Sequence, residues 1–269
     1  MQTFKLRSKG DSVRLLQELL NKANNNLVVD GDFGKKTENA VKDFQKKNKL
    51  IVDGIVGTKT WMKLNTIAPK DLKESPKKFL AEKDLIDLAK ELKVEVAAVK
   101  AFYEIESSGR GLLTSGKPKI LFEGHVFWKR LKKHGLNPSD HKEGNEDILY
   151  SKWTTKFYMG GEREYDRLNK AKKIHNAAAM ESASWGIFQI MGYHYKKVGY
   201  NSVGDYVKAM NKSERYHLMA FGKFIKSEGL VKHLKNKDWA KFALSYNGAG
   251  YKKNKYDAKL AAAYKKYSN

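Results

Sequence analysis

Residues 96–111 read VAAVKAFYEIESSGRG, an apolar stretch that ends in small polar residues and glycine. When residues 96–106 are placed on a helix that advances about 100° per residue, the apolar side chains gather on one broad arc. Glu106 falls on that arc, between Phe102 and Val99. The stretch therefore predicts a helix over 96–106 that carries one carboxyl group toward the core.

Glu104 falls on the opposite, polar face beside Lys100, and we expect its side chain to be solvated. The serines and glycine at 107–109 are expected to end the helix. Glu106 has two possible fates. It can pair with an arginine or backbone donors as a structural group, or it can line the floor of a cleft. In a cleft, desolvation raises the pKa of a carboxyl and keeps it protonated near neutral pH, as a glycosidase general acid requires.

The rest of the chain also reads as mainly α. Apolar residues recur at helical spacing in the segments KDLIDLAKEL, RYHLMAFGKFI and DWAKFALSYNG, and Asn247 and Gly248 stop the last of these. Residues 141–170 are polar and predict a long loop or a small hairpin. Residues 67–78, IAPKDLKESPKK, hold two of the four prolines and predict a linker between domains at 1–66 and 79–269.

The small N-terminal domain contains an internal repeat, VDGDFGKKT at 29–37 and VDGIVGTKT at 52–60. Asp-Gly favours a turn, because glycine adopts positive φ at little cost. Helical patterns precede and follow each copy, so we predict three helices with two equivalent loops. Asp30 and Asp53 are expected to shape the turns, and we assign no binding residue in this domain.

Composition narrows the function classes. The net charge of +23 favours a polyanionic partner such as nucleic acid, anionic lipid or a bacterial wall, but no basic block marks a specific nucleic-acid site. The absence of cysteine excludes disulfides and thiolate chemistry. The seven histidines show no ligand spacing, so no metal or other cofactor is expected. No apolar run approaches the roughly 18 residues that span a membrane, and no signal peptide is expected.

Other carboxylates stand near apolar runs. Glu123 follows Ile-Leu-Phe in KILFEGHVF, and it could support catalysis or pair with a buried arginine or His125. Four more compete with it and are left off the catalytic set: Glu162, Glu164, Asp166 and Glu181.

Two resemblances bear on function. The segments GDSVRLLQELL, VDGDFGKKTENAVKDFQKKNKL and VDGIVGTKTWMKL resemble the peptidoglycan-binding domain of many wall hydrolases, over residues 8–64. The blocks EIESSGRGLLTSGKPKILFEGHVFWKRL, ESASWGIFQIMGYHY and FALSYNGAGY resemble the N-acetylmuramidase domain of phage endolysins, over about 85–267. The second resemblance implies a lysozyme-like domain with Glu106 as catalytic acid, and Glu123 is our choice for the second carboxylate, as base or electrostatic support.

The same resemblance suggests substrate contacts. Gln189 is the polar exception in SASWGIFQIMG, and sugar recognition needs such neutral donors and acceptors, although a buried structural amide is the alternative. Tyr246 and Asn247 match the Tyr-Asn block of the lysozyme-like superfamily. Tyr246 also continues the helical stripe of Trp239, yet its place at the helix end would let its hydroxyl reach a cleft.

The expected protein is a modular endolysin that hydrolyses the β-1,4 bond between N-acetylmuramic acid and N-acetylglucosamine. The rivals are a lytic transglycosylase, which leaves a 1,6-anhydro sugar, a non-catalytic wall-binding protein, and a nucleic-acid binder that exploits the charge. We expect a monomer whose partner is bacterial peptidoglycan, with electrostatic attraction to anionic envelope material. The resemblance implies synthesis in the cytoplasm of an infected bacterium and release to the wall at lysis.

Overall fold

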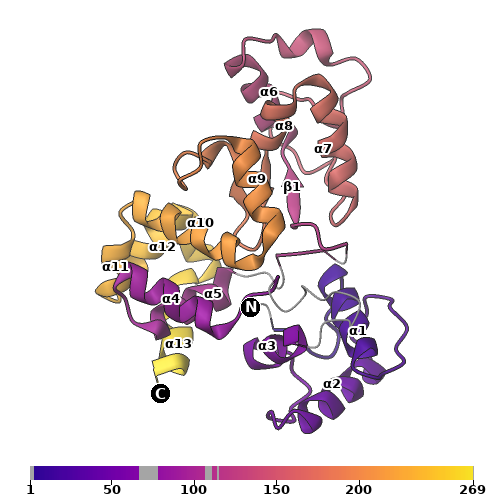
Figure 1. Ribbon diagram of the computed structural model, residues 1–269, viewed down its shortest axis with the longest axis vertical. Helices are drawn as coiled ribbons and strands as arrows, with labels where there is room; N and C mark the ends of the chain where they lie inside the picture. The colour runs from indigo at the N-terminus through magenta and orange to yellow at the C-terminus, as the bar shows by residue number, and fades with distance from the viewer. Residues whose placement is uncertain (1–2, 67–77, 107–110, 114, 269) are drawn as a thin grey trace. The chain divides into compact units, whose positions relative to one another are not determined.

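Figure 1 shows a computed structural model of the chain, which describes residues 3–66, 78–106, 111–113 and 115–268. The described residues are mainly helical, as the sequence predicts. Contacts within the chain divide it into two compact units, one of Met1–Arg110 with Glu228–Asn269 and one of Gly111–Ser227. The predicted domain boundaries at 66 and 79 stay a prediction, and the predicted linker lies outside the described residues except for Lys78.

The first unit is built from eight α-helices and a 3-10 helix within the residues that the structure describes. Their bounds are α1 Asp11–Lys22, α2 Lys35–Lys47, α3 Thr58–Thr66, α4 Glu82–Leu92, α5 Val96–Glu106, α11 Val231–Lys235, α12 Trp239–Asn247, η4 Ala249–Asn254 and α13 Tyr256–Ser268. The predicted helix over 96–106 is confirmed, while the residues expected to end it, 107–109, lie outside the described part of the chain.

Helices α1, α2 and α3 confirm the predicted three-helix arrangement, and each loop of the repeat is held by a buried glutamine. In the first copy, the side-chain amide of Gln17 donates to Asp30 Oδ1 at 2.7 Å and to Thr37 Oγ1 at 3.2 Å. Its carbonyl oxygen accepts the backbone N–H of Gly31 at 2.9 Å. Asp30 also accepts from the backbone N–H of Asp32, so this aspartate shapes the turn as predicted.

The second copy reproduces the network with different residues. Gln45 donates to Asp53 Oδ1 at 2.9 Å and to Thr60 Oγ1 at 3.2 Å, and accepts from the Gly54 N–H at 2.9 Å. Each glutamine is almost fully buried, so the hydrogen bonds satisfy a polar group that would otherwise be costly to bury. In both copies of the repeat, a buried glutamine side chain therefore holds the turn in place by hydrogen bonds.

Helix α5 packs against α4 and α13 (Figure 1), and burial extends around most of its circumference. Phe102 and Val99 are fully buried, as predicted. Tyr103, which was not assigned to either face, is also buried. The sequence pattern therefore placed the apolar arc correctly but underestimated how much of the helix is enclosed.

The second unit surrounds a small antiparallel sheet with strand order β1-β2-β3. Its strands are β1 Ile120–Phe122, β2 Ala183–Trp185 and β3 Ile190–Met191, with Ile120 opposite Trp185 and Ser184 opposite Met191. Its helices are α6 Gly124–Lys133, η2 Pro138–His141, α7 Arg163–Ile174, α8 Asn176–Glu181, η3 Gly192–His194, α9 Val203–Lys212 and α10 Glu214–Ser227.

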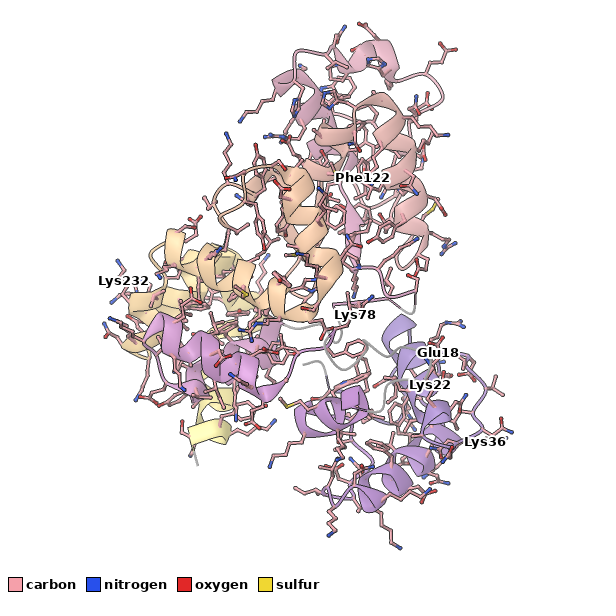
Figure 2. The ribbon with its side chains drawn as sticks, in the orientation of Figure 1. Glu18, Lys22, Lys36, Lys78, Phe122 and Lys232 are labelled. Carbon is pink, nitrogen blue, oxygen red and sulfur yellow. The ribbon has the colours of Figure 1, made fainter. Side chains whose placement is uncertain are left out.

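Helix α7 corrects the prediction of a loop or hairpin through residue 170. It packs against β1 (Figure 1), and its buried face includes an ion pair between Glu164 and Arg167, 2.8 Å apart. Phe122, labelled in Figure 2, donates its N–H to Glu164 and accepts at its carbonyl from Arg167. Because two charged residues occupy core positions, the apolar periodicity that would have marked this helix is broken.

None of the described helices is both long and apolar enough to cross a membrane.

Candidate active site

Glu106 lies at the C-terminal end of α5, where side chains from α12 and α13 of the same unit meet it. Tyr256 donates its hydroxyl to Glu106 Oε1, and Tyr246 makes a second hydrogen bond to the carboxyl group. The resemblance implies Tyr246 as a substrate contact, and its place near the end of α12 brings its hydroxyl to the carboxyl group. Tyr256, 150 residues from Glu106 along the chain, was missed.

The two tyrosines belong to an aromatic stack. The rings of Phe242 and Tyr246 are 5.8 Å apart at 17°, and those of Tyr246 and Tyr256 are 6.4 Å apart at 28°. Asn247, the last residue of α12, is exposed and hydrogen-bonds to the hydroxyl of Tyr256. The structure thus brings together three of the predicted residues, Glu106, Tyr246 and Asn247, around a tyrosine that the sequence did not single out.

Opposing effects act on the Glu106 carboxyl group. Burial raises its pKa, while the hydrogen bonds from Tyr256 and Tyr246 lower it, and the balance leaves the pKa above the ordinary value for glutamate. Burial and the nearby Glu106 also raise the pKa of both tyrosines, so their hydroxyls stay protonated and able to donate. The group can therefore hold a proton, and its ionised form has two hydrogen-bond donors in place.

Glu104 corrects the prediction of a solvated side chain paired with Lys100. Its carboxylate accepts from Tyr267 and forms a 2.8 Å ion pair with Lys266, both on α13. Burial raises its pKa, but the bonds from Lys266 and Tyr267 outweigh this effect and leave the pKa lowered. Lys100 pairs instead with Glu82. The difference arises because α13 covers the face of α5 that the helical pattern assigned to solvent.

Glu123 lies in the second unit, between the end of β1 and the start of α6. Its side chain is 16% exposed, and its Oε2 accepts the hydroxyl proton of Tyr158. His125 Nδ1 is 3.3 Å from the same oxygen but lacks the alignment of a hydrogen bond. Burial lowers the pKa of His125 against the opposing effect of Glu123. Tyr158 is a second site neighbour that sequence reasoning missed, because it stands in the polar 141–170 region.

Gln189 is largely engaged within the second unit. Its amide nitrogen donates to the carbonyls of Gly186 at 2.7 Å and Lys119 at 3.4 Å, and its Oε1 accepts from Ser184 Oγ at 2.8 Å. Its backbone φ of 48° places it in the left-handed region. These bonds match the structural alternative, and its predicted contact with sugar stays a prediction.

The carboxylates left off the catalytic set have clear structural surroundings where they are buried. Glu164 accepts the N–H groups of Met159 and Gly160 in addition to its pair with Arg167. Glu181 forms a 2.6 Å ion pair with Arg130 and also contacts His134. Glu162 and Asp166 are exposed. Among the described residues, no group of three or more histidine and acidic side chains could hold a metal ion.

Comparisons with known proteins agree with this architecture. Residues 95–268 match the family described as N-acetylmuramidase, and residues 9–64 match the family described as putative peptidoglycan binding domain. The crystal structure of a Burkholderia AP3 phage endolysin aligns over 99% of both chains, with a TM-score of 0.72 and 38% sequence identity.

A shorter match is to the N-acetylmuramoyl-L-alanine amidase CwlL of Bacillus licheniformis, which is 44% identical over 66 residues. The matched part is 22% of this chain and 18% of the amidase, so the chain spans less than a fifth of that relative.

Proposed function

Because the chain belongs to the N-acetylmuramidase family, we propose that it is an endolysin that hydrolyses bacterial peptidoglycan at the β-1,4 bond between N-acetylmuramic acid and N-acetylglucosamine. Its N-terminal domain belongs to the peptidoglycan-binding family and holds the wall. Tethering raises the local concentration of glycan for the catalytic domain. The net charge of +23 assists contact with anionic envelope material, and this assistance weakens with salt. Synthesis inside an infected bacterium and release at lysis belong to the same proposal.

The observation that carries the proposal is the environment of Glu106. Burial keeps the carboxyl protonated more readily than in water, which suits a general acid that protonates the leaving sugar oxygen. As the proton leaves, negative charge develops on the carboxylate. The hydroxyls of Tyr246 and Tyr256 already point at that group and stabilise the charge without reorganisation.

Glu123 is the second carboxylate of the proposal, as a base that activates water or as electrostatic support for the positive charge that develops on the sugar. Its Oε2 accepts a hydrogen bond from the hydroxyl of Tyr158. This assignment is a prediction, and Glu123→Gln assayed beside Glu106→Gln tests it.

The test compares Glu106→Gln with Glu104→Gln, a matched control two residues away on the same helix. We expect the first variant to lose at least roughly 10²–10⁴-fold in the rate of release of soluble muropeptides while still binding wall. The control, whose partners are Lys266 and Tyr267, should retain activity. Circular dichroism of both variants excludes unfolding as the cause.

Digestion of purified peptidoglycan in H₂¹⁸O identifies the bond and the reaction. A muramidase gives a reducing N-acetylmuramic acid that carries ¹⁸O. A lytic transglycosylase, the second candidate because it needs one acidic residue such as Glu106, gives a 1,6-anhydro end without ¹⁸O. An amidase frees the peptide and leaves the glycan whole. Either of the last two products, or full activity in Glu106→Gln, contradicts the proposal.

A further inference from the structure

Trp153 exposes an indole ring for which the fold of the second unit provides no cover. The residue is 66% exposed, whereas Trp185 in the same unit is 2% exposed and packed in the core. Tryptophan is enriched at binding surfaces, where its large flat ring supplies contact area and its N–H a hydrogen bond. The surroundings of Trp153 indicate what that contact is.

The indole is connected to Glu123 through one intermediate. Trp153 donates its N–H to the hydroxyl of Tyr158, and Tyr158 donates its own proton to Glu123 Oε2. The donor and acceptor in each of these two hydrogen bonds follow from chemistry, because an indole nitrogen can only donate and a phenol has one proton to donate. The N–H edge of the Trp153 indole therefore lies near Glu123. The two faces of the ring remain available to pack against a ligand.

The segment that carries Trp153 is anchored on both sides. Before it, Tyr150 accepts the backbone N–H of Gly124 at 3.2 Å and its ring lies 5.3 Å from that of Phe157. After it, Met159 donates its N–H to the buried Glu164 at 2.7 Å. The exposed ring thus stands on a preorganised loop, so little order would have to be gained on binding a ligand.

Glu123 retains hydrogen-bonding capacity beside the ring. Its Oε2 is taken by Tyr158, but no donor among the described residues reaches its Oε1, and the side chain is partly open to solvent. An ionised carboxylate oxygen accepts hydrogen bonds from hydroxyl and amide groups. An aromatic face next to such an acceptor complements a pyranose ring, which has an apolar C–H face and a polar edge.

We propose that Trp153 and Glu123 Oε1 form a saccharide subsite for an N-acetylhexosamine unit of the glycan, with Tyr158 as the residue that positions both. The inference deepens the proposed function and rests on it, since it assigns a glycan contact to the same protein. A cationic ligand is disfavoured by Lys152 and Lys156, which flank Trp153 in the sequence.

The test uses the full chain carrying Glu106→Gln, so that binding is measured without turnover, and N-acetylchitotetraose as the probe. We expect the probe to protect Trp153 from acrylamide quenching, and Trp153→Phe to remove the protected fraction of the fluorescence. Trp153→Ala should raise the dissociation constant measured by calorimetry about tenfold, which is about 1.4 kcal/mol. Trp153→Phe keeps a flat ring without the N–H and should remain within about threefold of the parent.

The matched control is Tyr193→Ala, which removes another exposed aromatic ring of the second unit that rests against Arg130. Its dissociation constant should equal that of the parent. The subsite is refuted by an unchanged constant in Trp153→Ala, by equal weakening in Trp153→Phe and Trp153→Ala, or by probe binding that leaves quenching unaltered. Failure of the proposed function appears separately, as cleavage that survives Glu106→Gln.

Discussion

Replacing Arg167 by methionine tests the buried ion pair of α7 most directly. The side chains of Glu164 and Arg167 are 0% and 1% exposed, and their atoms Oε2 and Nη1 are 2.8 Å apart. Arg167 also donates to the carbonyl of Phe122 at 2.8 Å and to that of Asp147 at 2.9 Å. The substitution keeps most of the volume, but it leaves a buried carboxylate without its cation and two carbonyls without a donor.

Breaking a buried pair by removing one partner costs about 3–5 kcal/mol. At about 2–4 °C per kcal/mol for a domain of this size, Arg167→Met should lower the melting temperature by roughly 6–20 °C. Adding Glu164→Gln removes the uncompensated charge while keeping an acceptor for the N–H groups of Met159 and Gly160. The double variant should therefore be more stable than Arg167→Met, with a coupling of about 0.5–3 kcal/mol.

Scanning calorimetry gives the melting temperatures, and hydrogen exchange of the Met159 and Gly160 amides reports local opening where the carboxylate accepts them. We expect faster exchange in Arg167→Met and partial recovery in the double variant. The reasoning is wrong if Arg167→Met melts within about 2 °C of the parent, or if the double variant is less stable than the single one.

Three further predictions address the other networks. Burial raises the folded-state pKa of Glu106, so its contribution to stability is present below the unfolded pKa and lost as pH rises through the folded pKa. Glu106→Gln should thus raise the melting temperature at pH 8 and change it little at pH 4, and a lower value at pH 8 would contradict this sign. Tyr256→Phe removes a donor that lowers the pKa of Glu106, so the alkaline limb of the pH profile of kcat/KM should move to higher pH; an unmoved or lower limb would count against Glu106 as the acid. Gln45→Leu should destabilise the N-terminal domain by about 1–3 kcal/mol, because it leaves the Gly54 N–H without its acceptor. Gln17→Leu should cost a similar amount, because it removes the acceptor of the Gly31 N–H. Urea unfolding measures both free energies, and a loss confined to one variant would refute the equivalence of the two loops.

The sequence by itself determined the local features of this protein. Helical periodicity placed α5 at 96–106 and turned Glu106, rather than Glu104, toward the apolar arc. The Asp-Gly repeats predicted two equivalent turns, in which Asp30 and Asp53 accept backbone N–H groups two residues on. These features depend on the conformation of one short segment, which nearby side chains dictate.

Only the tertiary structure decided which groups meet. Tyr256 reaches Glu106 from α13, and that same helix encloses Glu104, which local pattern had assigned to solvent. Helix α7 escaped prediction because its core face carries an ion pair, whose burial depends on β1 and the preceding loop. Periodicity shows which side of a segment is apolar. It does not show which distant segment will cover the other side. That covering segment supplies the hydrogen-bond or ion-pair partner of each buried polar group, so only the tertiary structure identifies the partner.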